Sequence, residues 1–396
     1  MKFLNFLLFL FIVLLPFGQL TRMSFGSATF YAHDLVLVAL IFVFLIFALA
    51  MRGKLTLPPV SILVLIFILF ALVSLINSLR LFSLGEVLIG ELFLLRFVLY
   101  FFLYLIVVNI IKKENVAFWL NTLLSVGLVV AILGFLQLAL FPDLSFLQAY
   151  GWDPHVGRLT STFLDPNFVG LFLVFSFALS LALFYFKKNL SKFFLVFPST
   201  FLIALILTFS RSSYLAWAVS LFSFGIFLSK RLFLLFLPLF LLSIIFLPRM
   251  AERISGAVLL DITAQARIVS WQNATQIIRD NPVLGVGFNN YRFAQIQYGF
   301  FDFERPEGGL SGAGSDSSLL LVLATTGFFG FLVFLAILFR ILLLSFHLKN
   351  TSVAALTVFS SLIALLVHSI FVNSVFYPWI LAWFWITLGL MVVESS

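Results

Sequence analysis

Four side chains in the middle of the sequence have types and spacings that could bind phosphate and move a proton. Arg211 and Arg267 have guanidinium groups, which make planar, bidentate contacts with phosphate oxygens. Trp271 follows Arg267 by four residues, so a helix would place both on one face. Asp316 has a carboxylate that can accept a proton from an attacking hydroxyl group, a role worth about 10²- to 10⁴-fold in rate. These residue types are compatible with a site that binds phosphate oxygens beside a carboxylate that can accept a proton.

Local sequence signals predict how two of these side chains are presented. Residues 261–281 read as a helix, with Asp261 as its N-cap and Pro282 just beyond its end. Asp316 has a second interpretation as the N-cap of the apolar helix that follows it, and the two roles are compatible. At that boundary partial desolvation would raise the pKa of Asp316, while the helix N-terminus would lower it.

Three further polar residues are candidates for substrate contacts near the ends of apolar runs. Arg158 and Asn167 flank the start of the run at 166–186. Arg96 lies inside another run, where an arginine costs about 2.5 to 3.5 kcal/mol on insertion scales, so it needs a partner or a ligand. Pairing with Glu91 and snorkelling toward the interface are the structural alternatives for Arg96.

Metal and nucleotide chemistry have weak signals in this sequence, and we predict no cofactor. The chain has no cysteine, and its four histidines are scattered and form no HExxH motif. Asp302 and Glu304 are the nearest approach to an acidic metal pair, but the surrounding charges favour a solvated run. There is no P-loop, and the segment Gly285-Val286-Gly287 reads as a turn.

Composition requires that these side chains are positioned by membrane helices. Of 396 residues, 63% are hydrophobic and 10% are charged, which is far more apolar than soluble domains are. A crossing needs about 20 apolar residues, so an all-α polytopic protein is predicted. Twelve apolar runs are expected to span the membrane, at 3–20, 33–51, 58–78, 91–111, 116–141, 166–186, 193–209, 213–229, 232–247, 317–345, 351–372 and 376–393.

The distribution of basic residues predicts the topology. All nine lysines fall in alternate connections, which places both termini in the cytoplasm and predicts a multi-pass protein of the cytoplasmic (inner) membrane. The net charge of +8 is therefore a topology signal, and nucleic-acid binding has little support. The 11 basic residues elsewhere are all arginine, which fits phosphate binding, although compositional drift is an alternative.

The longest polar segment, 248–316, is predicted to be a helical extracytoplasmic loop between the ninth and tenth spans. A flippase or secondary transporter would also have about twelve spans, but the related halves and paired broken helices typical of transporters are not evident. A non-catalytic partner in polysaccharide export is a third interpretation. The first apolar run is expected to be a retained helix, with a cleaved signal peptide as the alternative.

The motifs taken together resemble the O-antigen ligase and Wzy-type polymerase group of bacterial membrane glycosyltransferases. The resemblance covers about 157–330, and no single piece of it is specific. It rests on Gly157-Arg158, Thr162-Phe163, Pro166-Asn167, Ser210-Arg211, Arg267 with Trp271, Pro282, Gly285, Gly287, Asn290 and Tyr291, and Asp316 eleven residues before Gly327.

The resemblance implies a metal-independent transfer of glycan from an undecaprenyl-diphosphate carrier to an acceptor hydroxyl at the outer face. In that picture Arg211 and Arg267 hold the diphosphate and Asp316 assists the acceptor. Arg96, Arg158, Asn167, Trp271 and Tyr291 would contact substrate. Ligases usually carry His-Asn where this chain has Asp316-Ser317, which favours polymerisation or a related transfer.

The expected organisation has three parts, and the expected partners follow from the resemblance. Residues 1–141 would form five N-terminal spans, 142–345 the ligase-like core, and 346–396 the last two spans. The partners would be the lipid-linked glycan donor, a glycan or lipid acceptor, membrane lipid, and polysaccharide assembly proteins.

Overall fold

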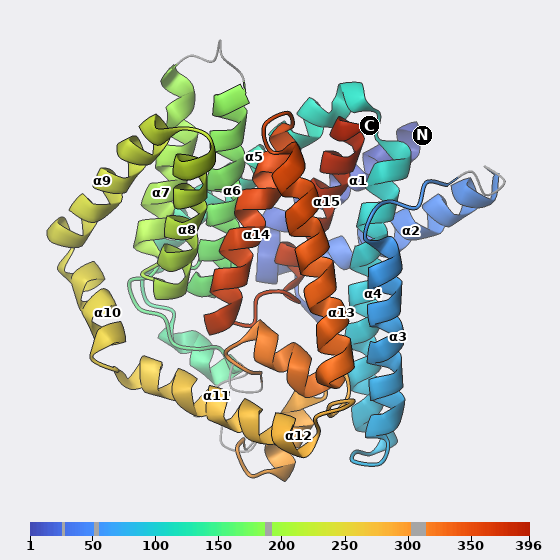
Figure 1. Ribbon diagram of the computed structural model, residues 1–396. Helices are drawn as coiled ribbons and strands as arrows, with labels where there is room; N and C mark the ends of the chain where they lie inside the picture. Colours follow the sequence, from blue (N-terminus) through green and yellow to red (C-terminus); the bar gives the residue numbers. More distant parts are fainter. Residues whose placement is uncertain (26–27, 51–54, 187–191, 302–313) are drawn as a thin grey trace.

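The computed structural model describes residues 1–25, 28–50, 55–186, 192–301 and 314–396, and these ranges are mainly helical (Figure 1). A short antiparallel hairpin, β1 (Met23–Phe25) and β2 (Ala28–Phe30), pairs Met23 with Phe30. The α-helices are α1 (Lys2–Leu14), α2 (Ala32–Ala50), α3 (Ser61–Ser78), α4 (Leu84–Ile110), α5 (Val116–Leu140), α6 (Pro166–Phe186), α7 (Val196–Leu207), α8 (Arg211–Phe227), α9 (Lys230–Phe246), α10 (Pro248–Val258), α11 (Ile262–Asp280), α12 (Tyr291–Gln297), α13 (Ser318–Leu348), α14 (Val353–Phe371) and α15 (Pro378–Ser395). The 3-10 helices are η1 (Leu15–Thr21), η2 (Lys113–Asn115), η3 (Ser145–Tyr150), η4 (Ser161–Phe163) and η5 (Lys192–Leu195).

The prediction of an all-α polytopic membrane protein is confirmed. Among the described residues, nine helices are long and apolar enough to cross a membrane, or ten if a bent pair counts as one span. Each of the twelve predicted runs contains a helix, but α7 has only 12 residues and α8 has 17. The number twelve therefore stays a prediction.

The centre of the bundle is formed by α6, α14 and α15. In the apolar stretches of α6 and α15, 83% of the residues are buried, and in that of α14 72% are buried. In the apolar stretch of α2 only 33% are buried. Phe175 on α6 packs against Trp383 on α15, with ring centroids 5.0 Å apart. Because lipid is as apolar as a protein core, the outer helices can expose leucine and phenylalanine at no cost.

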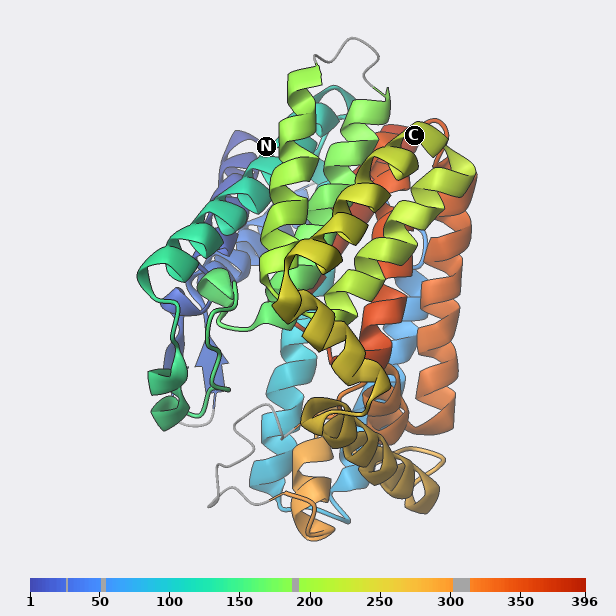
Figure 2. The ribbon, with the colours of Figure 1, turned by 90° about the vertical axis from the view of Figure 1, so that its left-hand side faces the viewer.

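Both termini lie at the same end of the bundle, and α10, α11 and α12 lie at the opposite end (Figures 1 and 2). The end with the termini also holds the lysines that flank α5, α9 and α14. This arrangement agrees with the alternation of charge in the sequence, while the cytoplasmic location of that end stays a prediction. Several residues on which sequence interpretations rest lie outside the described ranges, namely Arg52, Lys54, Lys187, Lys188, Asp302, Glu304 and Arg305.

A sharp bend after α9 brings the polar helices across the end of the bundle. The chain turns by 93° between α9 and the segment Pro248–Asp280. Pro248 occupies the first turn of α10, where its missing N–H costs no helical hydrogen bond. As a result α10 and α11 pass beneath α8 and α14 as an arc, shown in yellow in Figure 1.

The helix α13 is broken at Gly327, and the glycine-containing connection between α11 and α12 packs against this break. Gly327 has φ +66° inside α13, so the helical ladder is interrupted there. The connection between α11 and α12 fills the gap, since the Val286 N–H donates to the Ala324 carbonyl (2.9 Å) and the Phe328 N–H donates to the Pro282 carbonyl (2.8 Å). The predicted turn at 285–287 is confirmed, and it docks on this break.

We expect Gly327→Ala to destabilise the protein by roughly 1 to 3 kcal/mol or more, because a Cβ there would lie 2.2 Å from the Val283 carbonyl oxygen at a positive φ. The control is Gly85→Ala on α4, whose Cβ would meet nothing within 4 Å. Thermal unfolding in detergent measures both variants. Equal melting temperatures would show that the break in α13 does not need glycine.

Candidate active site

Arg211 and Arg267 line one cavity of about 350 Å³ at the junction of the bundle and the arc. Its walls come from the start of α8, from α10 and α11, and from the end of α14. Trp271 and Phe371 close one side, with ring centroids 5.9 Å apart. Two cations in a mainly apolar cavity suit the headgroup of an anionic lipid, because the phosphate and the alkyl chain each meet matching groups.

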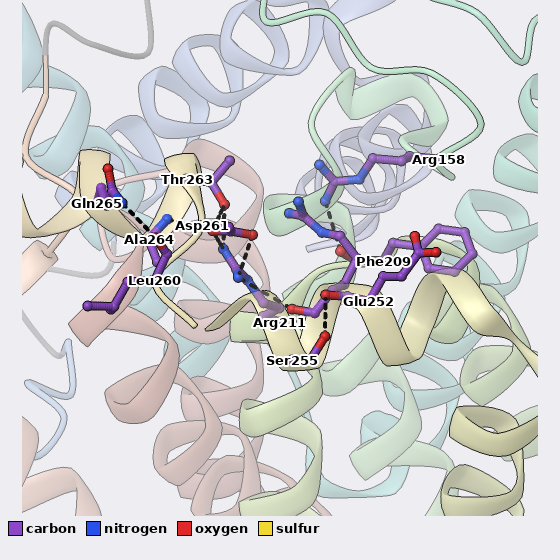
Figure 3. Close-up of polar contacts among 11 residues, drawn as sticks. Arg158, Phe209, Arg211, Glu252, Ser255, Leu260, Asp261, Thr263, Ala264 and Gln265 are labelled. Carbon is purple, nitrogen blue, oxygen red and sulfur yellow. Dashed lines mark hydrogen bonds and ion pairs between the residues drawn. The ribbon is translucent and has the colours of Figure 1, made fainter. Parts of the chain in front are cut away.

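Arg211 is the first residue of α8, and its guanidinium reaches across to α11. Nη1 and Nη2 donate to the two carboxylate oxygens of Asp261 at 3.0 and 3.1 Å, and they also donate to Thr263 Oγ1 and to the Arg253 carbonyl (Figure 3). Asp261 is also the N-cap of α11, as predicted, since it accepts from the Ala264 N–H at 2.9 Å. Arg211 is therefore held in a fixed orientation at the cavity wall.

Arg267 lines the same cavity, and its guanidinium has no close partner among the described residues. It makes no hydrogen bond or ion pair with any residue in the described ranges. Burial lowers its pKa, nearby Arg211 and Arg253 lower it further, and Asp316 and Asp261 act in the opposite direction. A half-buried guanidinium with free donors and cationic neighbours is stabilised by an anion.

Asp316 is fixed beside α11 through its backbone. Its N–H donates to Ser270 Oγ (3.0 Å), and its carbonyl accepts from Trp271 Nε1 (3.3 Å). The alternative interpretation of Asp316 as a helix N-cap is wrong, because Ser317 caps α13 by accepting from the Leu320 N–H. The carboxylate of Asp316 is therefore available for chemistry.

Burial raises the pKa of Asp316 to about 6, Arg267 opposes this shift, and Asp153 and Asp165 add to it. Asp316 precedes α13 and lies outside the membrane-spanning segments. A carboxylate with this pKa is deprotonated at neutral pH but is more basic than an ordinary aspartate. Both properties favour a general base. Tyr291, at the start of α12, is buried, and its pKa is raised by burial and by Asp316.

Arg158 and Asn167 contact the turn before Arg211 and do not line the cavity that Arg211 and Arg267 share. Arg158 Nε donates to the Thr208 carbonyl at 2.9 Å. Asn167 Oδ1 accepts from Ser210 Oγ at 2.8 Å, and Ser210 is the N-cap of α8. These contacts position α8 and Arg211. A direct contact of either residue with substrate stays a prediction.

Arg96 lies apart from Arg211 and Arg267, in a second cavity of about 510 Å³. The interpretation that it pairs with Glu91 is wrong, because its Nη2 lies 3.3 Å from Asp34 Oδ2 on α2. Arg96 also donates to the Thr29 carbonyl in the hairpin. The sequence could not reveal this partner, since 62 residues separate Arg96 from Asp34.

Sequence reasoning missed two residues around the first cavity. Arg253 on α10 has a buried Nε without a hydrogen-bond partner in the described chain, and its pKa is lowered by burial and by Arg211. His368 on α14 is fully buried, and its Nε2 lies 3.2 and 3.3 Å from the hydroxyls of Ser212 and Ser213. Arg249 and Arg253 are four residues apart on α10, and this spacing could have indicated that Arg253 belongs to the site. A lone histidine in an apolar helix gives no such indication.

Comparison with known families identifies the part of the chain that contains this cavity. Residues 193–335 match the model of a family described as O-Antigen ligase, and a comparison with curated proteins found no match. Residues 193–335 therefore resemble an O-antigen ligase domain. This domain contains Arg211, Arg267, Trp271, Tyr291 and Asp316.

This match supports a function of the O-antigen ligase or polymerase kind in surface-polysaccharide biosynthesis. Arg96, Arg158 and Asn167 precede the matched residues. In the described part of the chain, no three His, Asp or Glu residues are grouped so that they could hold a metal ion.

We expect Asp261→Asn to lower the rate of the O-antigen ligase domain about ten- to a hundredfold, because Arg211 loses its bidentate partner and its fixed orientation. Asparagine is as good an N-cap as aspartate, so α11 and the melting temperature should be nearly unchanged. The measurement is kcat/KM for glycan transfer, together with thermal unfolding. An equal or faster rate would mean that Asp261 competes with the substrate for Arg211.

Proposed function

We propose that the protein transfers a glycan from an undecaprenyl-diphosphate carrier to a hydroxyl group of an acceptor, at the outer face of the cytoplasmic membrane. The observation that carries this proposal is the cavity that Arg211 and Arg267 share, next to Asp316. The family comparison supports the general class of reaction.

In the proposed reaction the acceptor oxygen attacks the anomeric carbon of the donor sugar as the bond to the diphosphate oxygen breaks. The carrier diphosphate leaves with the bonding electrons, and Arg267 and Arg211 stabilise its charge. Asp316 accepts the proton of the hydroxyl group. These steps require neither a nucleotide sugar nor a metal ion, because the two guanidinium groups supply the positive charge that the leaving diphosphate needs.

The apolar lining of the first cavity supports a donor that is carried by a lipid. Leu215, Ile254 and Ile268 contribute to its walls, on helices that surround the two arginines. A free sugar diphosphate has no apolar groups that could contact this surface, whereas a lipid carrier has alkyl carbons next to its phosphates. Polymerisation is favoured over ligation by Asp316-Ser317 at the position where ligases usually carry His-Asn.

The test is transfer by the purified protein in liposomes that contain an undecaprenyl-diphosphate oligosaccharide and an acceptor glycolipid. We expect one carrier diphosphate to be released for each new glycosidic bond, measured by mass spectrometry. A flippase would instead move the donor between leaflets without forming a bond. Leaflet exchange without a new bond, in vesicles where the protein is folded, would contradict the proposed function.

A further inference from the structure

The second cavity has a volume of about 510 Å³ and shares no lining residue with the first cavity. Its size and lining are those of a ligand site. Small-molecule sites typically measure about 300 to 1,000 Å³. Its walls come from the hairpin, from α2 and α4, from the connection between α5 and α6, and from α12. Figure 2 shows the hairpin beside that connection, on the side away from α13.

The charged side chains of the second cavity balance, unlike those of the first. Three arginines and three aspartates line it, namely Arg22, Arg96, Arg292, Asp34, Asp153 and Asp165. The first cavity has two arginines in its lining and no acidic residue. Alternating donors and acceptors without net charge match the hydroxyl groups of a neutral sugar, whereas a phosphate requires an excess of cations.

Aromatic rings and unpartnered polar atoms complete this lining. The Arg22 guanidinium lies 5.6 Å from the centroid of the Trp152 ring, and the Arg292 guanidinium lies 5.2 Å from that of Phe93. Gln19 Oε1 and His155 Nε2 are buried, and each lacks a hydrogen-bond partner among the described residues. Buried polar atoms are normally paired, so these two indicate a place for a hydrogen-bonding ligand.

One rim of the second cavity is formed by exposed apolar side chains. Leu35 and Val38 on α2 are 57% and 51% exposed, and Leu92 and Leu95 on α4 are 42% and 51% exposed. These residues belong to helices that are long and apolar enough to span the membrane. The cavity therefore has a polar interior and an apolar opening, which suits a sugar that is attached to a lipid.

Electrostatic coupling connects the second cavity to the candidate base. Asp153 and Asp165, which line the cavity, act on the carboxyl group of Asp316, and Arg267 acts on Asp165. Asp153 and Asp165 therefore belong to the lining of the second cavity and also contribute to the charge environment of Asp316.

We propose that the second cavity binds the neutral sugar end of a lipid-anchored glycan, which is the acceptor. The assignment of this ligand as the acceptor rests on the proposed function. The binding of a lipid-anchored sugar can be measured without any transfer reaction. Trp152 provides an aromatic face for the sugar, Arg292 donates to its hydroxyl groups, and the lipid extends between α2 and α4.

The test uses protein in nanodiscs of phosphatidylglycerol and phosphatidylethanolamine, without donor. The probe is dodecyl maltoside with a photoreactive diazirine in its alkyl chain. We expect adducts on α2 and α4 that excess dodecyl maltoside suppresses and dodecyl phosphate does not. Trp152→Ala and Arg292→Ala should each lower labelling about fivefold, because a stacking face or a hydroxyl donor is lost.

Two matched controls separate local effects from damage to the fold. Tyr150→Ala removes an aromatic ring that is 73% exposed, two residues from Trp152, and Arg279→Ala removes an exposed arginine of α11. Neither residue lines the second cavity, so both variants should be labelled like the wild type. Adducts elsewhere, unchanged labelling of Trp152→Ala and Arg292→Ala, or equal competition by dodecyl phosphate would overturn the proposal.

The same variants distinguish failure of this inference from failure of the proposed function. In the transfer assay Trp152→Ala should raise KM for the acceptor about fivefold and leave KM for the lipid-diphosphate donor unchanged. If transfer occurs but labelling fails as described, the acceptor site is wrong. If labelling succeeds but no glycosidic bond forms, the cavity binds glycolipid and the transferase proposal is wrong.

Discussion

Arg267→Ala is expected to lower the rate of glycan transfer about 10³-fold while the protein remains folded. Arg267 has no partner among the described residues, so its full set of donors is available to the leaving diphosphate. Loss of a group that stabilises transition-state charge typically costs about 10²- to 10³-fold in kcat, and a charged donor belongs at the upper end.

Arg267→Lys tests the geometry of this contact, because lysine keeps the charge and loses the planar fork. We expect its rate to lie between that of the wild type and that of Arg267→Ala. Arg279→Ala, on the exposed end of the same helix, is the matched control and should transfer normally. Single-turnover rates at saturating donor measure the effect. A rate for Arg267→Ala within threefold of the control would rule out its role on the diphosphate.

Asp316→Asn is expected to lower the transfer rate about 10²- to 10⁴-fold, because an amide cannot accept the proton of the acceptor hydroxyl. The substitution is nearly isosteric, and the backbone contacts of residue 316 with Ser270 and Trp271 do not involve its side chain. Ser317 caps α13 in either case, so the helix should be unaffected.

The pH dependence provides a second readout for Asp316. A base must be deprotonated to act, and the pKa of Asp316 is raised to about 6, chiefly by burial. Wild-type activity should therefore fall about tenfold as the pH is lowered from 7 to 5, whereas the residual activity of Asp316→Asn should lose this dependence. The exposed carboxylate of Glu252 on α10 supplies the control, and Glu252→Gln should keep the wild-type profile. A wild-type profile that is flat across pH 6 would remove Asp316 from the role of base.

Local sequence patterns determined the elements of the fold, because each element depends on nearby residues. Apolar runs of sufficient length predicted the helices, and the N-cap at Asp261 was predicted from adjacent side chains. The shared face of Arg267 and Trp271 followed from a spacing of four residues, and both line one cavity. These features involve interactions within one or two helical turns.

Partners that lie far apart in the sequence were decided only by the tertiary structure. Arg211 contacts Asp261 across 50 residues, and the predicted pairing of Arg96 with Glu91 gave way to Asp34 across 62 residues. An isolated sequence favours the near carboxylate because it contains no information on how helices pack. The break at Gly327 and its docking on residues 282–286 have the same origin.

Composition and charge predicted a membrane-embedded helical protein, and residue types identified arginines and one aspartate as candidates for binding phosphate and accepting a proton. Composition and charge carry that information because the bilayer acts on every residue independently. The packing of distant segments sets Arg211 against the Asp261 carboxylate, leaves Arg267 without a partner among the described residues, and forms the second cavity. Sequence patterns do not contain this information, because the contacting segments lie far apart in the chain.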